Sequence, residues 1–391
     1  MAEWLSQILR QTGLGRSLAL VAILGLVGCA IPQVKAEDRL FLPVTAELLD
    51  VYMLPPQEFQ NTTVGGLSAL AYDRQTERFY ALSDDRGRFG PARFYTLAID
   101  FYQGNDPQPR FNTITLEAVT ELKDAEGNRY PAGFLDPEGL ALSPRNTVFI
   151  SSEGDDRQNA PPLIGEYDRT SGQLVATLPL PGRFLPSSGE SPSQGVQNNL
   201  SLESLTISAA PGTAGLMEPL RLFTATESAL AQDYIDDPSQ PLHSRFLHYL
   251  VGNDQVTLIA EHLYPLALES AGSVVNGLTE LLLLDQGGHF LALERAYGLR
   301  GFEVKLYQLA TGGATDTSTV ETLQGGLGRI SPIRKRLVLD FAETGLDVDN
   351  LEGMALGPRL ADGSQSLVLV SDNNFETERS TQIILLRLRL E

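Results

Sequence analysis

The chain of 391 residues contains one short pattern five times. Each copy has a strand-like run, opened by glutamate in four copies, and a second run that ends in Ser, Asp or Glu. Equivalent points of successive copies lie 70, 65, 77 and 72 residues apart, and they are Ser68, Glu138, Glu203, Glu280 and Glu352. A repeat of this length holds about four strands, the content of one propeller blade. The sequence therefore predicts an all-β fold, a β-propeller of four-stranded blades.

Hairpins are predicted inside the repeats by alternating apolar and polar residues. In the third copy, residues 245–251 lead through Gly252-Asn253-Asp254 into residues 256–260. Two such runs joined by a turn of these residues are typical of a β-hairpin. The 36 glycines and 23 prolines supply the turns that an all-β ring needs.

The fifth repeat ends one strand short, because the chain stops after the run 383–390. A further strand-like run, Val44–Tyr52, precedes the first repeat and has no hairpin partner nearby. Closure of a sheet removes its open edges. We therefore expect the early run to complete the last blade and close a ring of five blades. A sixth, divergent blade around Phe184 to Asn199 is the alternative.

The amino terminus is predicted to be a targeting segment. Arg10 and Arg16 precede an apolar run, residues 18–27, which is short for a membrane span of about 20 residues. The run ends in Leu26-Val27-Gly28-Cys29, which matches the bacterial lipobox and contains the one cysteine of the chain. We expect lipidation at Cys29 and a membrane-anchored lipoprotein of the periplasm or cell envelope.

Two alternatives to the lipoprotein remain open. One is ordinary export as a soluble periplasmic or secreted protein, cleaved after Val34-Lys35-Ala36. The other is an uncleaved amino-terminal anchor. In each case residues 1–36 form a signal peptide and short linker, and residues 40–391 form a single propeller domain. We expect this domain to be a monomer.

The charge of the chain excludes some partners. The sequence has 29 Lys and Arg against 49 Asp and Glu, a formal net charge of −20. Such a surface repels the phosphate backbone unless basic residues cluster, and Arg334-Lys335-Arg336 is the one short basic run. We therefore expect no nucleic-acid partner.

Repeated acidic residues are the candidate functional groups. The glutamates of the repeat stand at the start of inner strands, where a carboxylate is buried and needs a cation, a hydrogen-bond donor or a proton. Hard oxygen ligands of this kind suit Ca²⁺ far better than zinc. The alternative is structural: each glutamate accepts hydrogen bonds from backbone amides or pairs with an arginine. A second acidic set lies at the ends of the second runs: Asp84, Asp85, Glu153, Asp155, Glu227, Glu294 and Asp372.

These motifs resemble a known family. Asp136-Pro137-Glu138-Gly139, Leu202-Glu203-Ser204, Leu293-Glu294-Arg295 and Leu351-Glu352-Gly353 are similar to motifs of the phytase-like family called "esterase-like activity of phytase". Ser83-Asp84-Asp85-Arg86 fits its first blade and Val370-Ser371-Asp372 its last. The resemblance covers about residues 60–390.

The resemblance implies an exported propeller that hydrolyses ester or phosphoester bonds with calcium. It also implies a small anionic ester or phosphoester as substrate, with Arg86 and Arg295 as catalytic residues on the phosphate. The sequence has few basic residues among its motifs, which favours a smaller ester or phosphoester over phytate. The calcium ligands implied by the resemblance are Asp84, Glu138, Glu203, Glu280, Glu352 and Asp372.

Other hydrolytic chemistry lacks support in the sequence. There is no Gly-x-Ser-x-Gly nucleophile motif, and none of the four histidines stands beside a repeated motif. No His/Cys cluster has the spacing of a zinc site. The resemblance to the phytase-like family therefore favours a calcium-dependent hydrolase. A non-catalytic, lipid-anchored propeller that acts as a binding or assembly module is the alternative.

Overall fold

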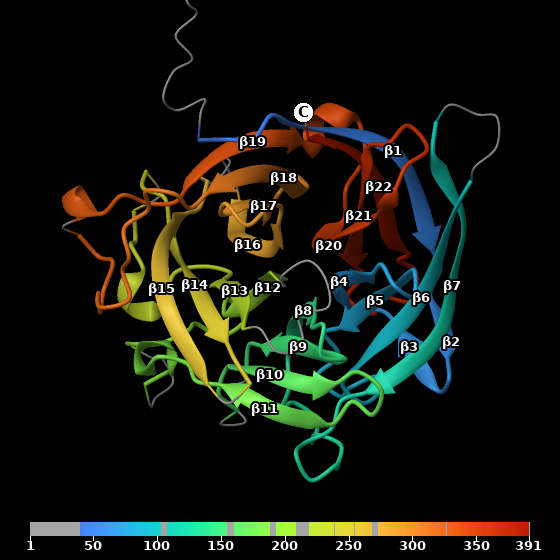
Figure 1. The fold of residues 1–391 in the computed structure, drawn as a ribbon, viewed down its shortest axis with the longest axis horizontal. Helices are drawn as coiled ribbons and strands as arrows, with labels where there is room; N and C mark the ends of the chain where they lie inside the picture. The colour runs from blue at the N-terminus through green and yellow to red at the C-terminus, as the bar shows by residue number, and fades with distance from the viewer. Residues whose placement is uncertain are drawn as a thin grey trace, which may run out of the picture. The chain divides into compact units, whose positions relative to one another are not determined.

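The protein is described by a computed structural model. It describes residues 40–102, 108–154, 160–187, 193–208, 219–237, 239–253, 255–267, 273–325 and 327–390. The predicted signal peptide and Cys29 lie outside these residues. Within residues 42–390 of this set, the strands form five four-stranded antiparallel sheets arranged as the blades of a propeller (Figure 1). The predicted all-β propeller is confirmed.

Four blades are continuous in sequence, and each begins with its innermost strand. Blade 1 contains β4 (Leu67–Asp73), β5 (Arg78–Ser83), β6 (Arg93–Tyr102) and β7 (Arg110–Glu121). Blade 2 contains β8 (Pro137–Leu142), β9 (Thr147–Ser152), β10 (Leu163–Asp168) and β11 (Leu174–Leu178). Blade 3 contains β12 (Leu202–Ser208), β13 (Leu220–Thr226), β14 (His243–Val251) and β15 (Val256–Pro265). Blade 4 contains β16 (Ser273–Leu283), β17 (His289–Gly298), β18 (Gly301–Ala310) and β19 (Arg334–Asp340).

The fifth blade closes the ring with a strand from the other end of the chain. It contains β20 (Asn350–Arg359), β21 (Gln365–Asp372), β22 (Thr381–Leu390) and, as its outer strand, β1 (Val44–Leu54). The antiparallel register of β1 and β22 runs from Val44 opposite Leu390 to Leu54 opposite Thr381. Five-blade closure by the early strand is therefore confirmed.

The remaining elements are short. In the described part of the segment proposed as a sixth blade there is one turn of 3₁₀ helix and no strand, so the six-blade alternative is wrong. No helix among the described residues is long and apolar enough to span a membrane. The short elements are β2 (Gln57–Phe59), β3 (Thr62–Val64), η3 (Gly182–Phe184), η5 (Ala231–Asp233), η6 (Leu327–Arg329) and η7 (Phe341–Thr344).

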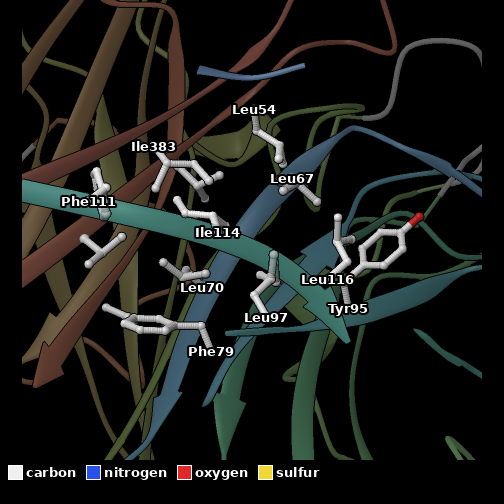
Figure 2. Packing of buried hydrophobic residues seen from close by; sticks show 14 of the residues in the cluster. Leu54, Leu67, Leu70, Phe79, Tyr95, Leu97, Phe111, Ile114, Leu116 and Ile383 are labelled. Atoms are coloured by element: carbon white, nitrogen blue, oxygen red, sulfur yellow. The ribbon is translucent and has the colours of Figure 1, made fainter. Parts of the chain in front are cut away.

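Apolar side chains fill the space between blades. Between blades 5 and 1, Leu67 and Leu70 of β4 pack with Phe79, Tyr95 and Ile383 (Figure 2). Each such side chain contributes about 1.5–3 kcal/mol when it is fully removed from water. The inner strands contact one another in the order β4, β8, β12, β16, β20 and back to β4. Packing between blades thus fixes the five inner strands around one channel.

Candidate metal centre

Each inner strand contains a β-bulge, at which a residue is left out of the pairing with the second strand of its blade. A bulge redirects the unpaired side chain away from the regular ladder. The bulged positions are Ser68, Glu138 with Gly139, Glu203, Thr279 and Glu352. Three blades therefore present a glutamate at this point, and blades 1 and 4 present a hydroxyl.

Thr279, and not Glu280, is the blade 4 equivalent of the repeated glutamates. Leu278 pairs with Glu294 and Glu280 pairs with Leu293, which leaves Thr279 unpaired. The Thr279 hydroxyl donates to the backbone oxygen of Leu351 in the next blade, at 3.4 Å. The Ser68 hydroxyl makes the same contact across the first interface, where it donates to the Pro137 oxygen at 3.2 Å. The sequence spacing was thus misaligned by one residue in blade 4.

The structure places Glu280 apart from the other predicted ligands. Its Oε1 accepts hydrogen bonds from the backbone N–H of Leu281 at 2.8 Å and of Leu205 at 3.4 Å. Burial raises the pKa of Glu280 well above its ordinary value, while backbone donors oppose the rise. This environment matches the structural alternative, in which a glutamate joins neighbouring blades through their amides.

Another set of equivalent positions is given by the register of the second strands: each lies directly after the residue that pairs with the one before the bulge. Four blades place an acid there: Asp84, Glu153, Glu227 and Asp372. In blade 4 the register gives this position to Arg295, because Glu294 pairs with Leu278 as Thr226 pairs with Leu202. Blade 4 therefore replaces both repeated acids, one by threonine and one by arginine.

The carboxylates converge at one end of the channel. Ligand oxygens of Asp136, Glu138 and Glu153 lie within 4.8 Å of one another, as do those of Glu153, Glu203 and Glu227. Glu153 belongs to both groups and joins them. In the described part of the chain the whole set, called the acidic cluster below, comprises Asp84, Asp136, Glu138, Glu153, Glu203, Glu227, Glu352 and Asp372.

Two arginines contact the acidic cluster among the described residues. Arg295 donates to Oε1 of Glu227 at 2.8 Å and to Oε1 of Glu352 at 2.5 Å. Arg86 donates through Nε to Oδ1 of Asp136 at 2.7 Å, and its Nη2 lies 2.6 Å from Oδ2. The Arg86 side chain is 37% exposed and that of Arg295 is 13% exposed, so Arg86 offers more surface to a ligand.

Comparison with known proteins identifies the family. A family model described as "Phytase-like: Esterase-like activity of phytase" matches residues 62–375. The chain belongs to this phytase-like family. No curated protein matches its sequence significantly.

Solved structures similar to this phytase-like protein share only its fold. An endo-arabinase from Bacteroides thetaiotaomicron is 11% identical, with a TM-score of 0.42 over 87% of this chain and 98% of that chain. The catalytic domain of the GH62 alpha-L-arabinofuranosidase of Coprinopsis cinerea is 9% identical, with a TM-score of 0.40 over 88% and 98% of the two chains.

Most of the acidic cluster of the phytase-like protein has strongly raised pKa values. Burial, followed by repulsion from Glu203 and Asp136, raises the pKa of Glu138 well above its ordinary value. Burial and then Glu227 and Glu153 do the same to the pKa of Glu203. Burial raises the pKa of Glu352 to about 8, although Arg295 acts in the opposite direction. Without a cation, burial and mutual repulsion therefore favour the protonated form of these carboxyls.

The donor set fits calcium. Oε2 of Glu153 and Oδ1 of Asp84 are buried and have no hydrogen-bond partner. Buried oxygens without a donor are costly, and calcium is a hard cation that takes six to eight oxygen ligands. Arg295 and Asn350 bind Glu227, Glu352 and Asp372, so the uncompensated oxygens belong to blades 1 and 2.

The structure brings together five of the six sequence-predicted ligands and leaves out Glu280. Both predicted arginines reach the same cluster. Three members of the cluster were not among the predicted ligands: Glu153 and Glu227 stood in the second acidic set, and Asp136, two residues before the bulged Glu138, was missed. Asn350 holds the same place before Glu352, where its Nδ2 donates to Oε1 of Glu352 at 2.8 Å. A polar residue two positions before the bulged glutamate was the sequence signal for both Asp136 and Asn350.

We expect the metal-free protein to lose stability as the pH rises from about 5 to about 8.5. Folding raises the pKa of the cluster carboxyls, so their contribution is complete below the ordinary value of 4.5 and is lost as the pH passes the folded value, about 8 for Glu352. Each proton that only the folded state retains gives a slope of about 1.4 kcal/mol per pH unit. Urea unfolding in EGTA measures it, and Glu352→Gln should reduce it. A flat profile would contradict the raised pKa values.

Proposed function

We propose that this phytase-like protein is a calcium-dependent hydrolase of a small anionic ester or phosphoester. One observation carries the proposal: eight carboxylates, seven of them on buried residues, gather around two arginines. Such an excess of negative charge is unfavourable without protons or a cation. The fold alone does not assign an activity, since propellers host many functions.

The residues that would hold calcium are the two groups that share Glu153. They are Asp136, Glu138, Glu153, Glu203 and Glu227. Bound calcium supplies neutralisation of anionic substrate oxygens and a lower pKa for a coordinated water. Arg86 is held by Asp136 and by the side-chain oxygen of Asn199, and its exposed part can orient the substrate anion. Arg295 has little exposed surface and mainly neutralises Glu227 and Glu352.

We expect calcium to raise the melting temperature of the protein. Binding to the folded state alone adds about 2.7 kcal/mol of stability when free calcium is 100 times its Kd. Glu153→Gln should remove most of this gain and Glu203→Gln a large part, because each removes a charged ligand. Glu280→Gln is the matched control: it is also a buried glutamate on an inner strand, but it accepts only backbone hydrogen bonds. Thermal melting with calcium and with EGTA measures the difference.

Catalysis needs a second measurement on the same protein. Release of phosphate or p-nitrophenol from p-nitrophenyl phosphate and p-nitrophenyl acetate should depend on calcium and fall with Glu153→Gln. Stabilisation by calcium without turnover would instead support the binding-module alternative. If calcium changes neither the melting temperature nor the rate, the metal site and the hydrolase are both rejected.

The cellular location remains a proposal from the sequence. We propose export and a lipid anchor at Cys29, on the basis of the lipobox at residues 26–29. Metabolic labelling with a fatty acid, compared between the native chain and Cys29→Ser, tests it. Label that persists in Cys29→Ser would reject the anchor.

A further inference from the structure

A pocket of about 620 Å³ lies over Arg295 at the edge of the acidic cluster. Its lining includes Glu227, Arg295 and Asn350, which are buried or nearly buried and linked by the hydrogen bonds of Arg295. A ligand in this pocket therefore rests against the cluster. The rest of the lining decides which chemical group fits there.

Blade 4 gives the pocket an exposed apolar and aromatic surface. Val275, Tyr297 and Phe302 stand in register on β16, β17 and β18 and all line the pocket. The Tyr297 and Phe302 rings lie 4.8 Å apart, and the Tyr297 residue is 49% exposed. Exposed aromatic surface beside a polar site is typical of a binding surface, because a ring offers a large apolar face with few rotatable bonds.

Loops from blades 3 and 5 add amide side chains to the same pocket. Asn198 and Asn199 precede β12 and Asn374 follows β21, and all three are exposed. Amide groups both donate and accept hydrogen bonds, as hydroxyl groups do. Two of them are held in place: Asn199 accepts from Arg86, and the backbone N–H of Asn374 donates to Asp372 at 2.6 Å.

The charges in the pocket limit the charge of the ligand. Arg379 also lines it, but Arg379 is paired with Asp349 at 3.1 Å and with Glu376 at 3.2 Å. Arg295 is paired with Glu227 and Glu352. Both lining arginines are thus already neutralised, which suits a ligand with one anionic group better than a polyphosphate.

We propose that this pocket binds a polyhydroxylated ring of the sugar class that carries a single anionic group. The apolar face of the ring would pack on Tyr297 and Phe302, and its hydroxyls would bond to the asparagines. Its anionic group would point to the calcium that the acidic cluster is proposed to hold. The inference rests on the proposed function, and it names the organic part of the substrate.

Calorimetry on the calcium-loaded protein tests the proposal with glucose 1-phosphate, inorganic phosphate, phenyl phosphate and phytate as probes. We expect glucose 1-phosphate to bind at least about tenfold more tightly than each of the others, since a good stacking contact and one or two hydrogen bonds are worth that factor. Tyr297→Ala and Asn374→Ala should each weaken it about fivefold to tenfold. Tyr102→Ala, on blade 1 and also exposed, is the control and should have no effect.

Other outcomes overturn the inference. Equal binding of phenyl phosphate would mean that the aromatic surface acts alone, and tighter binding of phytate would mean that charge dominates. Unchanged affinity in both pocket variants would place the ligand elsewhere. The calcium melting shift, measured on the same samples, separates this failure from failure of the proposed function, because the shift does not depend on the pocket.

Discussion

Replacing Arg295 by glutamine is expected to lower the free energy of unfolding of the metal-free protein by about 3–5 kcal/mol at pH 8, the usual cost of removing one partner of a buried ion pair. Glu227 and Glu352 would lose their common cation, and the Asn350 side chain would lose a donor. Although burial acts against it, the pKa of Arg295 is raised by Glu227, Glu352 and Glu203, so the guanidinium is firmly charged. Urea unfolding in EGTA measures the loss.

Calcium should restore much of the stability lost in Arg295→Gln, because the freed carboxylates become additional ligands. The variant should therefore bind more calcium than the native protein in a calorimetric titration. Arg86→Gln is the comparison, and its effect should be smaller because Arg86 is 37% exposed. If Arg295→Gln is as stable as the native protein in EGTA, then Arg295 does not neutralise the cluster.

Arg295 also explains why the acidic cluster is not symmetric. Blades 1, 2, 3 and 5 each contribute an acid at the equivalent position of the second strand's register, while blade 4 contributes this arginine. The guanidinium binds Glu227 of blade 3 and Glu352 of blade 5, whereas Oε2 of Glu153 and Oδ1 of Asp84, in blades 2 and 1, have no donor. The presence of Arg295 in blade 4, where the other blades have an acid, thus determines on which side of the acidic cluster a cation is needed.

The sequence was sufficient for the blade count and the ring closure. The number of repeats gives the number of inner strands. The last blade lacks one strand in the sequence, so the unpaired early strand is expected to complete it. Both inferences use features that all copies share, namely strand length and order. For the same reason most of the acidic cluster could be predicted, because its members recur at equivalent points.

The spacing of the repeats could not show that the bulge in blade 4 falls on Thr279, one residue before Glu280. A β-bulge adds one residue to one strand, so an acid one position further along is directed elsewhere. Thr279 and Ser68 each donate a hydrogen bond to a backbone oxygen of the next blade. No pattern of residue types in the sequence would indicate this equivalence. The pairing of Arg295 with two blades is likewise a tertiary contact, which forms only when blades 3, 4 and 5 pack together.

A second buried charge network, away from the channel, fastens the long segment between β18 and β19. Arg245 on β14 is fully buried, and its Nε lies 2.6 Å from Asp233 while its Nη1 lies 2.5 Å from Glu261. The same guanidinium donates to the backbone oxygens of Val320 and Glu321 at 2.9 and 3.1 Å. Arg245 is therefore one of the residues that hold the segment against blade 3, together with backbone hydrogen bonds such as Thr317 N–H to Glu261 O.

Arg245→Met is expected to lower the free energy of unfolding by about 3–5 kcal/mol, since Asp233 and Glu261 would keep buried charges with fewer partners. The side chain has similar volume, so the loss reports charge and hydrogen bonding more than packing. Limited proteolysis should also cut the segment 311–325 faster, because its backbone oxygens lose their donor. The control is Arg78→Met, whose pair with Glu117 is solvent-exposed and should matter little. If both variants unfold at the same urea concentration, Arg245 does not fasten the segment, and its other hydrogen bonds to blade 3 are sufficient.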